Sequence, residues 1–187
     1  MTNSVLRPGQ IHSRLSLPNG DKAILRGPEW NDLEGVIQYI NSLVREHAQI
    51  GMTIPVTRES EAQWLGQRLA EIENGRTLMV VAEIDGQIVS VGDLQPLTGE
   101  RNHTGYLGIG VVKSKRGTGL SKRMMLALLA LARKMRLKIV ILDVFATNTV
   151  AIRLYESVGF KEVGRVPKGI RREGKYIDLV RMTKELP

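Results

Sequence analysis

The segment KRGTGLSKRMMLALLALARKM, residues 115–135, joins a basic, glycine-containing loop to a long apolar helix pattern. An apolar strand pattern ends just before it at Val112, so a strand, a tight loop and a helix follow one another. The first turn of a helix leaves N–H groups without intrahelical partners and lies at the positive end of the helix dipole. Gly117 and Gly119 let an anion approach this backbone without a Cβ in the way. The segment therefore predicts an anion-binding loop, with a plain turn as the alternative.

Basic side chains are concentrated around this loop. The chain has a net charge of +8, from 27 Lys and Arg against 19 Asp and Glu, and residues 101–142 contain no acidic side chain. The basic residues of this stretch are Arg101, Lys113, Lys115, Arg116, Lys122, Arg123, Arg133, Lys134, Arg136 and Lys138. A phosphorylated cofactor, a nucleic acid or an acidic protein would each be attracted to this charge, which alone does not choose among them. A solvated basic face is the remaining alternative.

Length and composition favour one domain. The 187 residues contain no low-complexity linker, and we expect a polar N-terminal arm over residues 1–20 and a single domain over residues 21–187. No apolar run reaches the roughly 20 residues that a bilayer span needs, and no secretory signal pattern opens the chain, so a cytoplasmic protein without membrane contact is expected. There is no cysteine, and the three histidines are scattered along the chain, so no metal site is expected.

Helix and strand patterns alternate along the chain. Strand patterns occupy residues 22–26, 77–84, 87–95, 103–112, 138–144, 160–166 and 175–185, and helix patterns occupy residues 31–46, 57–73, 117–136 and 148–158. Thr57 and Asn148 stand at N-cap positions, and Gly159 ends the last helix pattern. The turn Asp85-Gly86 between two apolar strand patterns is a strong hairpin signal.

Two motifs in this order resemble a known family. The first is V-x-x-x-x-R-G-x-G at residues 111–119, and the second is N-x-x-A-x-x-L-Y-x-x-x-G-F at residues 148–160. Together they resemble the GCN5-related N-acetyltransferase (GNAT) superfamily over most of residues 22–185. The resemblance implies an α/β (α+β) fold with a mixed, mostly antiparallel central sheet and helices on both faces. It also implies a splay between the fourth and fifth strands, at 103–112 and 138–144, that holds acetyl-CoA as acyl donor, with no metal.

The resemblance assigns the cofactor contacts. The backbone of Val111, Val112 and Lys113 would pair with the pantetheine arm. The pyrophosphate would lie on Arg116, Gly117, Thr118, Gly119, Leu120, Ser121 and Lys122. Ser121 departs from the family's Gly or Ala, but serine is small and its hydroxyl can donate to a phosphate. In the second motif, Asn148 would bond the pantetheine amides, with Ala151 and Tyr155 also at the cofactor, while a plain N-cap is the alternative for Asn148.

Tyr155 is the expected catalytic acid. Direct attack of an amine on the thioester leaves a CoA thiolate that needs a proton, and a phenol can supply it. In the family the tyrosine of the second motif commonly lies near the cofactor sulfur. The alternative is a tyrosine that only packs an amphipathic helix.

The sequence offers several candidates for the general base. Many relatives place a glutamate on the strand before the phosphate loop, whereas this chain has Tyr106-Leu107-Gly108 there. The candidates are Glu83, His103 or a chain of water molecules. The alternatives are a surface carboxylate for Glu83 and a structural or solvated histidine for His103.

Three functions follow from these observations. The first is acetylation of a small primary amine or amino acid, and the second is acetylation of a protein N-terminus or lysine. The third is a non-catalytic module that binds CoA or nucleic acid, which is disfavoured because the chain lacks the aromatic stacking set of single-strand readers. Residues 29–55 and 167–175 are expected to shape the acceptor site, and a homodimer is plausible by resemblance.

Overall fold

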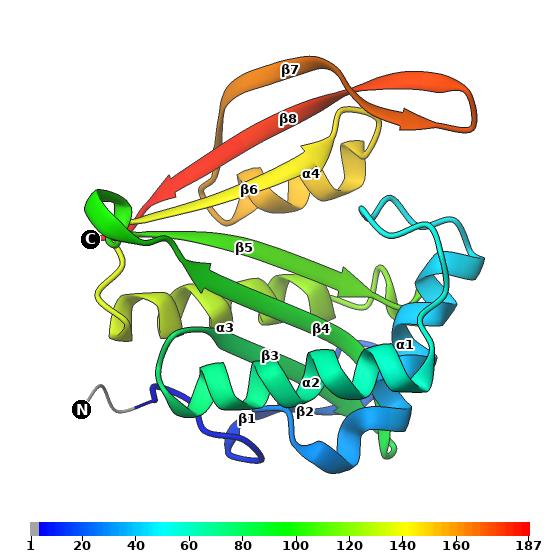
Figure 1. The fold of residues 1–187 in the computed structure, drawn as a ribbon, viewed down its shortest axis with the longest axis vertical. Coiled ribbons are helices and arrows are strands. Elements are labelled where there is room, and N and C mark those ends of the chain that lie inside the picture. The colour runs from blue at the N-terminus through cyan, green and yellow to red at the C-terminus, as the bar shows by residue number, and fades with distance from the viewer. Residues whose placement is uncertain (1–3) are drawn as a thin grey trace.

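One mixed sheet organises the computed structural model, which describes residues 4–187 (Figure 1). Its strands are β1 (Ile11–Ser16), β2 (Lys22–Arg26), β3 (Leu78–Ile84), β4 (Gln87–Pro96), β5 (Thr104–Val111), β6 (Ile139–Phe145), β7 (Lys161–Arg172) and β8 (Lys175–Glu185). They lie in the order β1-β2-β3-β4-β5-β6-β8-β7. The helices are α1 (Leu33–Arg45), α2 (Arg58–Glu73), α3 (Leu120–Lys134) and α4 (Thr149–Ser157).

The sheet opens between β5 and β6. These two strands are parallel and pair only from Thr104–Ile139 to Tyr106–Ile141, whereas every other neighbouring pair is antiparallel. Beyond that point the two strands diverge into the V seen in Figure 1. The predicted mixed, mostly antiparallel sheet and its splay are confirmed, although an extra strand before residue 22 makes the diverging pair the fifth and sixth.

Helices cover both faces of the sheet because its central strands are apolar on both sides. In β3, Val80 and Ala82 belong to the main core with α3, while Met79 and Val81 pack with α1 and with Ile72 of α2. Thr57 caps α2 as predicted, since its hydroxyl accepts from the Ser60 N–H at 3.2 Å. Over residues 4–187, no helix is long and apolar enough to cross a membrane.

The prediction of a polar N-terminal arm over residues 1–20 is wrong for much of that range. Residues 1–3 lie outside the described residues, but Ile11–Ser16 form an edge strand paired with β2, and Leu6 and Leu17 are buried. As an edge strand, β1 has no fully buried side chain, so it lacks the apolar alternation that marks a strand in sequence.

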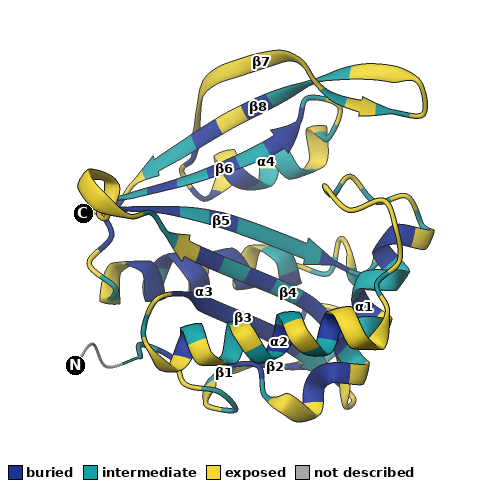
Figure 2. Ribbon diagram, viewed as in Figure 1, coloured by how far each residue is buried: buried dark blue, intermediate teal, exposed yellow. Residues whose placement is uncertain are grey.

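The last two strands form a long, exposed hairpin. β8 has the predicted bounds, whereas β7 continues past the predicted end at residue 166 to Arg172, with a register shift between Val166 and Ile170. The distal half of this hairpin projects beyond the rest of the sheet, and most of β7 is exposed (Figure 2). A shift of this kind lets a strand continue past residues that the alternating pattern does not mark.

Candidate functional site

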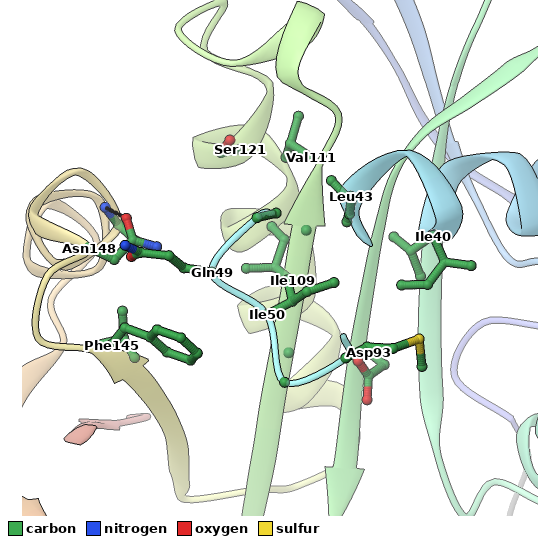
Figure 3. A pocket seen from close by; sticks show the side chains of 18 of the residues that line it. Ile40, Leu43, Gln49, Ile50, Asp93, Ile109, Val111, Ser121, Phe145 and Asn148 are labelled. Atoms are coloured by element: carbon green, nitrogen blue, oxygen red, sulfur yellow. Dashed lines mark hydrogen bonds between the residues drawn. The ribbon is translucent and has the colours of Figure 1, made fainter. Parts of the chain in front are cut away.

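A cavity of about 920 Å³ lies where β5 and β6 diverge. Its walls come from α1, the loop after α1, α2, β4, β5, β6 and α4, so it joins the strand gap to a chamber under the first two helices. Figure 3 shows β5 running through it, with Ile109 and Val111 on that strand and Ser121 at the start of α3. One cavity therefore reaches both the predicted anion loop and the acidic side chains described below.

The edge of β5 forms one side of the gap. After Tyr106 no residue of β6 pairs with β5, so residues 107–111 are bonded as a strand only to β4. At its end, the Val111 carbonyl accepts from Arg116 Nε at 3.0 Å, and the Val112 N–H donates to the Val89 carbonyl at 3.0 Å. Of the backbone groups predicted to contact pantetheine, the Val111 carbonyl and the Val112 N–H therefore already have protein partners. The part of β5 between Tyr106 and Val111 faces the gap.

The glycine loop and the start of α3 adopt the predicted form. Gly117 and Gly119 have φ of +76° and +85°, and Gly119 is the N-cap of α3. A Cβ on Gly117 would meet no atom within 4 Å, so this glycine supplies its backbone conformation and an open approach. Thr118 Oγ1 donates to the Lys115 carbonyl at 2.8 Å, which fixes the loop. Leu120 is fully buried, so its side chain is part of the core and does not contact an anion.

Part of the basic charge near the loop is already neutralised. The Arg116 guanidinium binds the carboxylate of Glu46, at the end of α1, and Lys115 Nζ lies 2.6 Å from Asp21 Oδ2. Lys113 and Lys122 are exposed. The attraction for an anion therefore rests on the helix N–H groups and these exposed lysines more than on the Arg116 side chain.

Asn148 caps α4 and faces the cavity. Its Oδ1 accepts from the Ala151 N–H at 3.2 Å, which confirms the N-cap interpretation, while its amide nitrogen has no hydrogen bond with a described residue. Gln49, from the loop after α1, donates to Thr147 Oγ1 at 3.0 Å and lies beside Asn148 (Figure 3). Asn148 can therefore cap the helix and still donate into the cavity.

Tyr155 lines the cavity from α4. Its side chain is buried, and its ring packs against Phe160 with centroids 6.1 Å apart. Burial raises the pKa of the Tyr155 phenol to about 12. The packing role and a catalytic role are both compatible with this position, because a phenol with such a pKa carries its proton at neutral pH and can donate it.

Asp93 is a site residue that sequence reasoning missed. It lies on β4 opposite Gly108 of β5, and its carboxylate is at the cavity (Figure 3). A Cβ on residue 108 would lie 2.8 Å from Asp93 Oδ1, so glycine there makes room for the carboxylate. Burial raises the pKa of Asp93, which the charge of Arg68 and a backbone N–H partly oppose. The signal in the sequence is a single carboxylate within an apolar strand.

A second carboxylate at the cavity, Asp143 of β6, is already paired. Arg181 of β8 donates to it twice, both at 2.8 Å, and holds its pKa below the usual range, with a further contribution from the Tyr106 phenol. Burial and this contact raise the pKa of Tyr106 to about 12. Arg181 thus holds the Asp143 carboxylate in its ionised form, which makes Asp143 a poor proton acceptor.

The two proposed bases lie away from the cavity walls. Glu83 accepts from Arg26 at 2.8 and 3.0 Å, and Arg26 also binds Asp32 at 2.6 Å, on the part of the sheet next to β2. His103 is exposed, and its carbonyl accepts from two N–H groups at the closed end of the β5–β6 pairing. The geometry therefore supports neither residue as the base, because neither reaches the chamber.

Glu83 is expected to act on stability instead. The substitution Glu83→Gln weakens its two bonds to Arg26 and should lower the free energy of unfolding by about 1 kcal/mol, because the pair is partly exposed. Urea unfolding beside the exposed control Glu100→Gln measures this. An unchanged stability together with lost turnover would return Glu83 to the site.

Within residues 4–187, no three or more His, Asp or Glu side chains are grouped so as to hold a metal ion.

Some curated proteins of similar sequence are named as acetyltransferases of amino acids or of methionine derivatives. The L-amino acid N-acetyltransferase AaaT of Escherichia coli is 29% identical over 86% of this chain and 96% of that protein. The L-methionine sulfoximine/L-methionine sulfone acetyltransferase of Pseudomonas aeruginosa is 26% identical over 83% of this chain and 90% of that protein.

Solved structures share the fold. The ribosomal-protein-alanine N-acetyltransferase of Brucella melitensis is 28% identical, with a TM-score of 0.78 over 87% of this chain and 99% of that one. A phosphinothricin acetyltransferase of Sinorhizobium meliloti, solved in complex with acetyl-CoA, is 17% identical, with a TM-score of 0.77 over 88% of each chain. At that identity the second likeness concerns the fold alone.

The family model for the acetyltransferase (GNAT) family matches residues 41–160. This range contains the glycine loop, Asp93, Asn148 and Tyr155. The chain belongs to the acetyltransferase (GNAT) family and is an N-acetyltransferase.

Proposed function

We propose that this enzyme acetylates the amino group of a free amino acid or a similarly small primary amine. The observation that carries the proposal is the cavity, which connects the strand gap and the glycine loop to the space under α1 and α2 that contains Asp93. The amino-acid acetyltransferases among its relatives support this class of acceptor.

The residues present fit acetyl-CoA, which supplies the thioester. The β5 edge before Val111 offers backbone groups to an extended arm, and the amide nitrogen of Asn148 is available to donate. The N–H groups of Leu120, Ser121 and Lys122 precede the first intrahelical donor, Arg123, and suit a pyrophosphate. Lys113 and Lys122 add charge at the rim, while Ala151 and Tyr155 line the cavity from α4.

The placement of the pyrophosphate is tested at Gly119. The substitution Gly119→Glu puts a carboxylate at the first turn of α3 and should weaken acetyl-CoA binding at least about tenfold through like-charge repulsion. Gly119→Gln imposes the same backbone strain and size without the charge, so it should bind more tightly than the Glu variant. Calorimetric titration measures both. Equal affinity of the two variants would contradict the placement.

Two side chains can move the protons of the reaction. An ammonium must lose a proton before it attacks, and we infer that the Asp93 carboxylate accepts it, because burial already favours its protonated form. Attack forms the N–C bond and breaks the C–S bond, the attacking nitrogen releases its second proton, and the thiolate takes a proton. Tyr155 holds that proton on its phenol at neutral pH.

The loop after α1 favours a small acceptor over a peptide. A peptide would need an open groove between α2 and the last hairpin. Arg172 of β7 donates to the Ala48 carbonyl at 2.9 Å and to the His47 carbonyl, and its guanidinium lies 6.0 Å from the centre of the Phe145 ring. These contacts join the loop to the hairpin, and we infer that this connection narrows the route that a peptide would take.

Thiol release from acetyl-CoA across a panel of free amino acids, primary amines and short peptides tests the proposal. Turnover is expected with amino acids or small amines and at most weakly with peptides. Turnover of peptides alone would favour acetylation of protein amines, and binding without turnover of any amine would favour a module that only binds CoA.

A further inference from the structure

Glu61 is a further carboxylate at the cavity, and it has no partner among the described residues. Glu61 lies in the first part of α2, is 6% exposed and lines the cavity. Its carboxylate makes no hydrogen bond or ion pair with any described residue. Because no fully buried side-chain oxygen of the described residues lacks a partner, the Glu61 oxygens are open to the cavity, where a ligand or water can satisfy the charge.

The surroundings of Glu61 are apolar. Val36 and Ile40 of α1, Val56 before α2 and Trp64 one turn later line the same cavity. Burial alone raises the pKa of Glu61. An acidic residue at a helix N-terminus does not require this burial, because Glu59 in the same turn is exposed. The position of Glu61 therefore needs another explanation.

The other charged groups of the cavity are accounted for. Glu46 binds Arg116, and Asp143 binds Arg181. Arg68 is 2.8 Å from Glu71 and lies against the Trp64 ring, near enough to Asp93 to act on its pKa. His47, also at the cavity, is exposed and faces Glu173. Two carboxylates, Asp93 and Glu61, remain for the acceptor.

We propose that Glu61 binds a second cationic nitrogen of the acceptor, so that the enzyme prefers amines with two amino groups, a diamine or a basic amino acid. The inference rests on the proposed function, in which Asp93 serves the amine that reacts. Asp93 and Glu61 then bind the two ends of one molecule, and the apolar wall between α1 and α2 contacts its methylene chain.

Four acceptors with matched carbon chains separate the effect of a second amine on kcat/KM from the effect of a carboxylate. Cadaverine and n-pentylamine differ only in the second amine, and so do L-lysine and L-norleucine, while the amino acids add a carboxylate. We expect kcat/KM to be at least about tenfold higher for each doubly aminated member, beyond the doubling that the equivalent ends of cadaverine give by themselves. Mass spectrometry of the products identifies which lysine nitrogen is acetylated.

The substitution Glu61→Gln keeps the shape and removes the charge. It should lower the ratio of kcat/KM between cadaverine and n-pentylamine by about tenfold. The exposed neighbour Glu59→Gln is the matched control and should keep the wild-type ratio. Thermal unfolding of each variant shows that it is folded, and the wild-type comparison needs no variant.

The outcomes are distinct. Equal turnover of all four acceptors, or an unchanged ratio in a folded Glu61→Gln, overturns this inference and leaves the proposed function intact. Absence of turnover with every amine, despite acetyl-CoA binding, removes both. Preference for cadaverine over lysine identifies diamines as the source of the second cation, and the reverse identifies basic amino acids.

Discussion

Asp93→Asn is expected to lower kcat for amine acetylation by about 10²–10³-fold. The amide has nearly the shape of the carboxylate beside Gly108 but cannot accept a proton from the bound ammonium. Initial rates of thiol release at saturating acetyl-CoA measure the loss. Asp85→Asn, in the exposed β3–β4 turn, is the matched control and should keep the wild-type rate.

The same variant gives a prediction for pH. Because burial raises the pKa of Asp93, its basic form is lost as pH falls through a value above the usual aspartate range. The wild-type rate should therefore decrease on acidification at a higher pH than an exposed aspartate would cause. In the ratio of wild type to Asp93→Asn, the ionisation of the amine itself cancels. An Asn variant with the wild-type rate and profile would exclude Asp93 as the base.

Tyr155→Phe should lower kcat by about 10–100-fold and leave the affinity for acetyl-CoA nearly unchanged. The ring contact with Phe160 is kept, and only the proton donor is removed. The effect is expected to be smaller than at Asp93 because a thiolate can leave before it is protonated, whereas an ammonium cannot attack until it has lost a proton. Tyr176→Phe, on an exposed tyrosine, is the control. An unchanged kcat would remove Tyr155 from the mechanism.

The fold was largely predictable because its motifs are contiguous in sequence. The strand ending at Val112, the glycine loop and the helix after it form one local unit, and the Asn148 motif forms another. β1 was missed because an edge strand can be held by backbone pairing alone, without apolar alternation. The end of β7 was missed because its register shift breaks the alternating pattern.

The site was predictable only where its residues are close in sequence. Asp93 meets Gly108 through strand pairing, and no local pattern marks that contact. No local pattern around Glu83 predicts its ion pair, because its partner Arg26 lies 57 residues away in the sequence. The pairing of Arg116 with Glu46, which reaches it from the end of α1, is equally absent from any local pattern.

A single turnover with radiolabelled acetyl-CoA and excess enzyme tests most directly whether a bound amine attacks the thioester itself. The account predicts that the label passes to the amine at the rate of thiol release and that the protein carries no label at any time. Without amine, acetyl-CoA should stay bound and intact. Thiol release without amine, together with label on the protein, would contradict direct transfer in this cavity.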